Sequence, residues 1–382
     1  MSDLLFKICF VSPTVYPLFN SQERACYGEA EIQIYELASY LGKEPGMEIS
    51  VVTGDYGQDD IEFYSGVLVY KYKPAARSGW LRRFLPGRSS LHELLKKIDA
   101  SIYIMAGASG LSGEAADFCV KNRRGFLFRI THQRDCDGTF TRGAGEEGEK
   151  YLQALRQTYC VVCQTQEQQA LLRRRETVKT IVIPNGVAPR PLTEGARNEV
   201  VWFGETVNWK QPELFFRLAL SVPEQRFTFY ATPDDPEYFE RLVAKTRDIP
   251  NLGVQNSMPY LEVIALLDKA KLFVNTSRFE GFPYLFSQAF AAGVPVVSLN
   301  ADPDGVIEKK QLGVFAHGSE VRMVQGVRDL IAYEKQWKRL SDNAVRFANE
   351  EQNIHAIAGE YSQIFLKCAG ALGGKKKKTA RR

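Results

Sequence analysis

The sequence predicts an α/β fold made of two doubly wound domains that face each other across a cleft. The chain has 382 residues, too many for one hydrophobic core, and fits two domains of roughly 180 residues each. Apolar strand patterns alternate with helical patterns in both halves, which is typical of parallel sheets covered by helices. A polar stretch, Ala188–Arg197, separates the halves and is predicted to be a linker.

The first half begins with a βαβ unit. Lys7–Ser12 is an apolar strand that ends in a Pro-rich turn, and apolar side chains recur at helical spacing from Ile32 to Leu41. Gly28 lies just before this helix, where a backbone can approach a ligand closely, although a simple turn explains the glycine about as well. The further predicted strands are Ile49–Thr53, Val67–Tyr72, Ser101–Met105, Gly125–Ile130, Tyr159–Cys163 and Ile181–Pro184. The further predicted helices are Leu91–Ile98, Ala115–Lys121, Lys150–Thr158 and Gln166–Arg174.

The same alternation restarts after the linker. The predicted strands there include Val200–Phe203 and Arg226–Tyr230. The predicted helices are Glu213–Leu220, Glu237–Lys245, Tyr260–Asp268, Val321–Tyr333, Gln336–Phe347 and Ile354–Lys367.

The stretch Val274–Leu299 carries the clearest chemistry. It reads as the end of a strand, a loop, a helix that starts near Pro283, and a further strand. A helix N-terminus that follows the carboxyl end of a parallel strand binds anions. Glu280 lies at this N-terminus, and because a carboxylate repels phosphate, we expect it to bind hydroxyl groups. Phosphate and hydroxyls together indicate a nucleotide sugar as the ligand.

His132 is a second candidate for a functional residue. The predicted strand Gly125–Ile130 places Thr131 and His132 at its carboxyl end, the edge of an open α/β sheet where ligands bind. Arg134 and Asp135 follow in the same loop.

Charge and cysteine content exclude several classes of protein. The formal charge of +4 comes from a basic tail: without Lys375–Lys378, Arg381 and Arg382, 43 basic residues stand against 45 acidic ones, which argues against nucleic-acid binding. Residues 373–382 are predicted to be a disordered tail that can touch an anionic membrane surface. The seven cysteines and the absence of a signal peptide or membrane span predict a cytoplasmic protein with reduced thiols. Cys160 and Cys163 have metal-ligand spacing but lie in a predicted strand, so we expect core cysteines.

Four motifs in order resemble a known family. They are Gly28-Glu-Ala-Glu31, His132, Pro184-Asn-Gly-Val187, and Ser277–Phe282 followed by Ala292–Val296. In these motifs the chain resembles glycosyltransferase family 4 of the GT-B fold, from Lys7 to about Lys367. The resemblance implies two Rossmann-like domains: residues 1–187 on the acceptor side, with helix 354–370 packing back on them, and residues 198–353 on the donor side.

The resemblance also implies a reaction: metal-independent, retaining transfer from a nucleoside-diphosphate sugar to a glycan or lipid-linked acceptor, in polysaccharide biosynthesis. Lys210 and the backbone amides after Gly281 would hold the diphosphate, Glu280 the donor sugar, and Gln288 the ribose. His132 would lie near the sugar, so that His132, Lys210 and Glu280 form the catalytic set. The other residues expected to bind the donor are Gly28, Phe282, Tyr284 and Leu285. No metal and no bound cofactor are expected.

Two positions depart from the family pattern. Gln288 replaces a glutamate, which costs the charge-assisted part of a hydrogen bond, on the order of 1 kcal/mol. Glu205 replaces an arginine five residues before Lys210, so a cation expected to stabilise the leaving diphosphate is missing. Compensation by Arg278, Arg134 or Arg24, a different mode of donor binding, and loss of activity all remain open.

Two other functions therefore stay in view. One is a GT-B protein that binds a nucleotide sugar or glycan without turnover, and the other, less favoured, is a sugar-nucleotide epimerase. The basic, aromatic loop Arg77–Arg88 and the tail predict a peripheral membrane contact.

Overall fold

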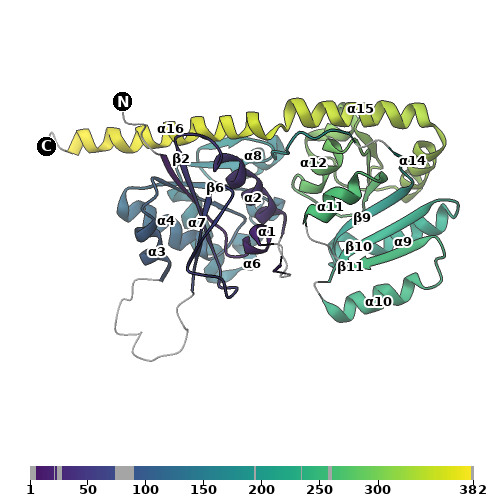
Figure 1. The fold of residues 1–382 in the computed structure, drawn as a ribbon, viewed down its shortest axis with the longest axis horizontal. Coiled ribbons are helices and arrows are strands. Elements are labelled where there is room, and N and C mark those ends of the chain that lie inside the picture. The colour runs from purple at the N-terminus through teal and green to yellow at the C-terminus, as the bar shows by residue number, and fades with distance from the viewer. Residues whose placement is uncertain are drawn as a thin grey trace. The chain divides into compact units, whose positions relative to one another are not determined.

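The computed structural model consists of two compact units (Figure 1). It describes residues 6–20, 22–23, 28–73, 90–192, 195–233, 235–256 and 260–379. Unit 1 comprises Met1–Gly186 and Ile354–Arg382, and unit 2 comprises Val187–Asn353. Each unit has one sheet with helices on both faces, so the predicted α/β class is confirmed (Figure 1).

Unit 1 contains an eight-stranded sheet with the order β3-β4-β2-β1-β5-β6-β7-β8. All neighbouring strands pair in parallel except β3 and β4, which are antiparallel. The strands are β1 (Phe6–Val11), β2 (Met47–Thr53), β3 (Ile61–Tyr64), β4 (Val67–Lys71), β5 (Ile102–Ala106), β6 (Gly125–Arg129), β7 (Cys160–Cys163) and β8 (Thr180–Val182). The antiparallel strand β3 was not predicted from the sequence.

Both faces of this sheet are buried, which explains why its strands are continuous apolar runs. In β1, Ile8 and Phe10 contribute to one core cluster, whereas Cys9 and Val11 contribute to the cluster on the other face. Helices α2 (Glu29–Leu41) and α16 (Ile354–Thr379) cover the first face. Helices α3 (Ser90–Ile98), α4 (Leu111–Asn122), α7 (Gly145–Gln157) and α8 (Gln166–Arg173) cover the second. The short helices α1 (Tyr16–Phe19), α5 (Gln133–Cys136) and α6 (Thr139–Gly143) lie in loops.

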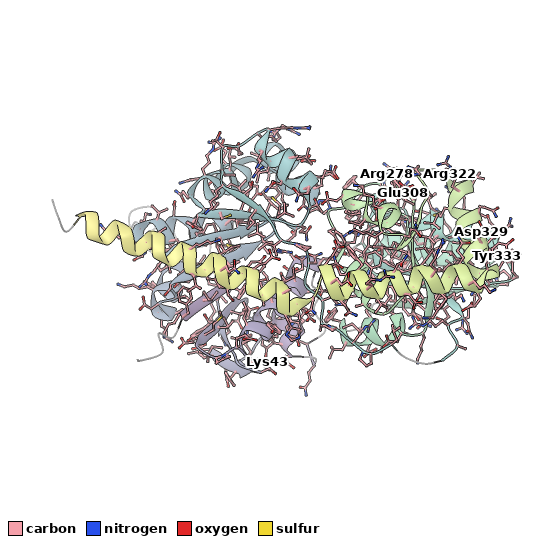
Figure 2. All side chains as sticks on the ribbon, turned by 90° about the horizontal axis from the view of Figure 1, so that it is seen from above. Lys43, Arg278, Glu308, Arg322, Asp329 and Tyr333 are labelled. Carbon is pink, nitrogen blue, oxygen red and sulfur yellow. The ribbon has the colours of Figure 1, made fainter. Side chains whose placement is uncertain are left out.

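Unit 2 contains a parallel six-stranded sheet with the order β11-β10-β9-β12-β13-β14. The strands are β9 (Glu199–Glu205), β10 (Arg226–Thr232), β11 (Leu252–Asn256), β12 (Ala270–Asn275), β13 (Val296–Ser298) and β14 (Gly313–Phe315). Helices α9 (Pro212–Ser221), α10 (Pro236–Thr246) and α14 (Glu320–Ala332) pack on one face. Helices α11 (Tyr260–Leu267), α12 (Tyr284–Ala291) and α13 (Val306–Lys309) pack on the other, and α15 (Glu334–Glu351) contributes to both cores. Figure 2 shows Tyr333 at the turn between α14 and α15.

The polar segment after Val187 is fixed to unit 2, in contrast to the free linker that its composition suggested. The backbone N–H of Val187 donates to the carbonyl of Gln352 at 2.7 Å. The Arg190 side chain donates to the carbonyls of Ile264 and Gln288, both at 3.3 Å, and forms an ion pair with Asp268. The guanidinium therefore attaches this segment to α11 and α12.

Helix α16 belongs to unit 1, where Ile354, Tyr361 and Phe365 enter the core next to β1 and β5. Its backbone runs to Thr379, but the side chains of residues 373–379 and all of residues 380–382 lie outside the described residues. The same holds for the loop Arg77–Arg88 and for Arg24, so the predictions made for these segments stay predictions. Across the described part of the chain, no helix is both long and apolar enough to cross a membrane.

Six of the seven cysteines lie among the described residues, all of them buried in unit 1 and none in a disulfide. Burial raises the pKa of the Cys9 and Cys163 thiols to about 12 and that of Cys368 to about 11. Thiols with such pKa values are protonated at neutral pH and therefore react slowly.

A buried arginine binds several segments of unit 1 near Gly186, where the chain passes from unit 1 to unit 2. Arg129, at the end of β6, is 6% exposed. Its guanidinium donates to five acceptors: Gln33 Oε1 at 2.8 Å, Tyr361 Oη at 2.5 Å, Asn185 Oδ1 at 2.8 Å, and the carbonyls of Ile183 and Pro184 at 3.3 Å. Among the residues that the structure describes, none forms an ion pair with Arg129. Neutral acceptors from α2, α16 and the segment before Gly186 thus converge on one cation.

Candidate functional site

A lysine and a glutamate meet where the sheet of unit 2 reverses its strand order. From β9 the chain builds the sheet outward through β10 and β11, then returns to place β12 on the other side of β9. Ligands bind at such a switch point, outside the carboxyl ends of the strands. Lys210 follows β9 and Glu280 follows β12, and Lys210 Nζ lies 2.7 Å from Glu280 Oε1. The side chains are 13% and 3% exposed, so the ion pair is largely withdrawn from water.

Hydrogen bonds fix the loop of Lys210 to the loop of Glu280. Asn208–Lys210 forms one turn of 3₁₀ helix. Thr276 Oγ1 donates to the Lys210 carbonyl at 2.6 Å and itself accepts from Trp202 Nε1 at 2.9 Å. The backbone N–H of Arg278 donates to the Trp209 carbonyl at 2.9 Å. The position of the ammonium group therefore depends on a buried side-chain network under both loops.

Two aromatic residues beside the ion pair were not anticipated from the sequence. The rings of Trp209 and Phe279 are stacked, with centroids 5.3 Å apart and planes 11° from parallel. Lys210 Nζ lies 4.5 Å from the Trp209 ring centroid, within range of a cation–π interaction. Each aromatic residue directly precedes a predicted site residue, which is the one sequence signal that pointed to it.

Helix α12 carries three of the eight predicted donor-binding residues, Tyr284, Leu285 and Gln288. Its N-cap is Pro283, and no side chain caps the first turn. Phe282 and Tyr284 are buried in the core of unit 2, and Leu285 packs against it. In this stretch, therefore, the backbone after Gly281, more than the side chains, is suited to contact a ligand.

Gln288, in the same helix, is 3% exposed and belongs to a polar cluster. Its Nε2 donates to Tyr260 Oη at 2.7 Å and to Tyr284 Oη at 3.0 Å. Both N–H groups of the amide thus have acceptors, which leaves Oε1 as the atom suited to accept from a hydroxyl group.

Gly28 and His132 lie in unit 1, at the carboxyl edge of its sheet. Gly28 is the N-cap of α2, and its N–H donates to Glu31 Oε2 at 2.9 Å. Gly107, with φ +75°, lies between the two segments: a Cβ there would be 3.7 Å from Ala30 Cβ and 3.3 Å from Thr131 Oγ1. The start of α2 and the loop of His132 are therefore neighbours within this unit.

The His132 ring is oriented by the short helix that it caps. His132 Nδ1 accepts from the Arg134 backbone N–H at 3.1 Å, so the neutral ring carries its proton on Nε2. Asp135 Oδ2 accepts from the backbone N–H of His132 at 3.0 Å and from the N–H and hydroxyl of Thr131. Burial raises the pKa of the Asp135 carboxyl, and these hydrogen bonds oppose that shift. His132 is thus built to donate a hydrogen bond from Nε2.

Metal-binding chemistry finds no support in the described residues. Cys160 and Cys163 belong to opposite core clusters, so their side chains lie on opposite faces of the sheet and cannot bind one ion. Within the described ranges, no three His, Cys, Asp or Glu side chains are grouped closely enough to hold a metal.

The fold resembles those of solved glycosyltransferase structures. Sucrose-phosphate synthase from Thermosynechococcus elongatus is 16% identical, with a TM-score of 0.74 over 96% of this chain and 100% of that one. Anabaena HepE, in a structure with UDP and glucose, is 16% identical, with a TM-score of 0.71 over 95% of this chain and 100% of that one. Residues 197–333 match the family model described as "Glycosyl transferases group 1". The match places residues 197–333 in that family, and the structural likeness shows the fold of nearly the whole chain.

A curated protein that matches part of this chain is an uncharacterized glycosyltransferase from Haemophilus influenzae, 22% identical over 200 residues. The match spans 50% of the chain and 56% of that relative, so the chain covers little more than half of its length. The predicted GT-B fold is thereby confirmed, and the predicted family is supported over residues 197–333. The roles assigned to individual residues of the site remain predictions.

Proposed function

We propose that the protein is a metal-independent, retaining glycosyltransferase that moves a sugar from a nucleoside-diphosphate sugar to a glycan or lipid-linked acceptor. The observation that carries the proposal is the Lys210–Glu280 ion pair at the switch point of unit 2, beside the N-terminus of α12. A cation and a helix N-terminus together suit a diphosphate, and an adjacent carboxylate suits sugar hydroxyls.

When the donor binds, Lys210 and Glu280 would each contact a different part of the ligand. The Lys210 ammonium would bind the diphosphate, with the backbone amides after Gly281, and Glu280 would accept from hydroxyls of the donor sugar. Gln288 Oε1 would accept from a ribose hydroxyl, because the amide nitrogen already donates to Tyr260 and Tyr284.

Catalysis would depend on stabilising the leaving diphosphate. Its negative charge grows as the bond to the sugar breaks, and preorganised donors aimed at that charge lower the barrier. Lys210 and the N-terminus of α12 would supply the donors. His132 would donate from Nε2 to an oxygen of the sugar and so hold it in position.

A second candidate function is binding of a nucleotide sugar or glycan without turnover. Glu205 favours it, because an exposed carboxylate ends β9 where the family arginine is expected. A negative charge at this place would oppose the charge that develops on the diphosphate.

Two measurements on the purified full-length protein separate these functions. Thermal shifts with UDP, GDP, ADP and their sugars would identify the donor, because a ligand that binds only the folded state raises stability by mass action. Hydrolysis or transfer of that donor would support the glycosyltransferase. A shift without turnover over a broad set of acceptors would instead favour the binding protein, and the absence of any shift would contradict both.

Restoring the family cation should raise turnover. We expect Glu205→Arg to increase kcat/KM for the donor by about tenfold, because it replaces a repulsive charge with a stabilising one. Glu224→Arg is the control, since Glu224 is exposed in the turn between α9 and β10, before that strand begins. Equal rates for wild type and Glu205→Arg would show that position 205 does not face the diphosphate.

The acceptor site is assigned to unit 1, together with a peripheral membrane contact through the loop Arg77–Arg88 and the tail. Flotation with anionic liposomes should recover the full-length protein and less of a variant that lacks residues 375–382. Equal recovery of the two would remove the tail from the proposal.

A further inference from the structure

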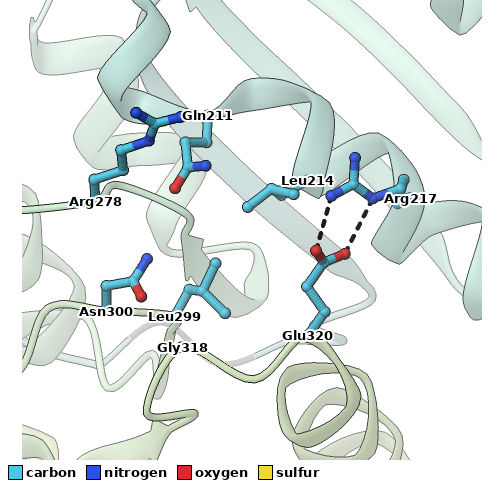
Figure 3. A pocket seen from close by; sticks show the side chains of 8 residues that line it. All are labelled: Gln211, Leu214, Arg217, Arg278, Leu299, Asn300, Gly318 and Glu320. Carbon is cyan, nitrogen blue, oxygen red and sulfur yellow. Dashed lines mark hydrogen bonds and ion pairs between the residues drawn. The ribbon is translucent and has the colours of Figure 1, made fainter.

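A hollow lies at the carboxyl edge of the unit 2 sheet. The hollow is a pocket with a volume of about 310 Å³. Its lining, drawn in Figure 3, comes from α9 and its N-cap, from the loop after β12, from the segments after β13 and β14 and from the start of α14. Its lining residues are Gln211, Leu214, Arg217, Arg278, Leu299, Asn300, Gly318 and Glu320. A pocket of about 350 Å³ shares Gln211, Leu214, Arg217 and Arg278 with it, so the two adjoin, and together they are called the trough.

This trough is distinct from the site of the Lys210–Glu280 pair. Neither of those residues lines it. Leu214 and Leu299 belong to the core on the face of α9 and α14, whereas α12 packs on the opposite face.

Most charges in the trough are already paired. Arg217 donates to both carboxylate oxygens of Glu320, at 3.0 and 2.8 Å (Figure 3). Lys245 lies 3.4 Å from Glu213. Arg278 is the exception: it is exposed, and no described residue pairs with its guanidinium. The Arg278 guanidinium is therefore available to bind an oxyanion with two parallel hydrogen bonds.

The other groups in the trough fit a ligand with hydroxyls. Helix α9 begins here at Pro212 without a side-chain cap, which adds the positive end of its dipole. The amides of Gln211 and Asn300 stand on either side of the hollow in Figure 3, and Leu214 and Leu299 form its apolar part. Amides bind hydroxyl groups through both donors and acceptors.

We propose that this trough binds a small polyhydroxylated molecule with one oxyanion group, a phosphate or a carboxylate, which Arg278 holds. Neither Lys210 nor Glu280 lines this trough, and the proposal does not depend on the proposed function.

Titration calorimetry with glucose 6-phosphate tests the proposal, with glucuronate, inorganic phosphate and glucose as comparison ligands. We expect saturable binding of glucose 6-phosphate, and about tenfold weaker binding in Arg278→Gln, which loses a charge-assisted contact. Comparing glucose 6-phosphate with glucuronate identifies the oxyanion. Inorganic phosphate and glucose should each bind more weakly than the ligand that combines their groups.

Two further variants sharpen the test. Arg339→Gln is the matched control, because Arg339 is exposed on α15 and does not line the trough. Glu320→Gln should strengthen binding severalfold, because it releases Arg217 from its carboxylate partner. Wild-type affinity in Arg278→Gln, or no saturable binding of either acidic sugar, would overturn the proposal. Binding of inorganic phosphate as tight as that of glucose 6-phosphate would overturn its polyhydroxylated part.

Discussion

Lys210→Ala is expected to weaken binding of the nucleoside-diphosphate donor by about 100-fold, because a charge-assisted contact to the diphosphate is lost. The substitution should also destabilise unit 2 by about 3 kcal/mol, since it leaves Glu280, which is 3% exposed, without its cation. Calorimetric titration of the nucleotide and urea unfolding measure the two effects separately.

A double variant separates binding from folding. Lys210→Met with Glu280→Gln removes both charges, so stability should recover toward wild type while nucleotide affinity stays low. Lys269→Ala is the control, because Lys269 is an exposed lysine in the turn before β12. Nucleotide affinity in Lys210→Ala equal to that of wild type would remove the role assigned to Lys210.

Arg129→Met is expected to destabilise unit 1 by about 4 kcal/mol. It removes the donor of five hydrogen bonds in a region where the arginine is only 6% exposed. The loss of stability in Arg129→Lys should lie between zero and the loss in Arg129→Met, because an ammonium keeps the charge but cannot reach acceptors in so many directions. Urea unfolding, monitored by circular dichroism, measures this loss of stability. We expect the urea concentration at the unfolding midpoint to fall for one of the two units.

The control for Arg129 is another arginine of the same unit. Arg124 pairs with Asp99 at the surface, where the two side chains are 32% and 68% exposed. Arg124→Met should cost no more than about 1 kcal/mol, as exposed ion pairs contribute little. If Arg129→Met cost as little as Arg124→Met, the buried network would not hold unit 1 together.

The sequence was most informative where one side-chain pattern determines the element. A strand buried on both faces is a continuous apolar run, so β1 and β6 were predicted close to their observed bounds. Strand β3 was missed because it is a short antiparallel edge strand, with Ile61 and Phe63 exposed at 42% and 67%. Strand β11 was missed for a related reason, because Gln255 and Asn256 at its end are polar and exposed.

Contacts between distant segments could not be predicted in this way. Lys210 and Glu280 were both selected from the sequence, but for different groups of the ligand. Their direct contact follows from the adjacent positions of β9 and β12 in the sheet. Arg129 was not selected at all, since an arginine at the end of a strand looks ordinary until the residues around it are known. Its acceptors are 54 to 232 positions away in the chain, up to Tyr361.

The cysteines and the tryptophans are divided between the two units, so each unit has its own reporter side chains. All seven cysteines fall in the ranges of unit 1, whereas Trp202, Trp209 and Trp337 fall in unit 2, with only Trp80 elsewhere. Labelling kinetics of the six buried thiols therefore time the opening of unit 1, and indole fluorescence in a Trp80→Phe background follows unit 2 alone. Each unit can thus be observed in the intact protein through its own native side chains.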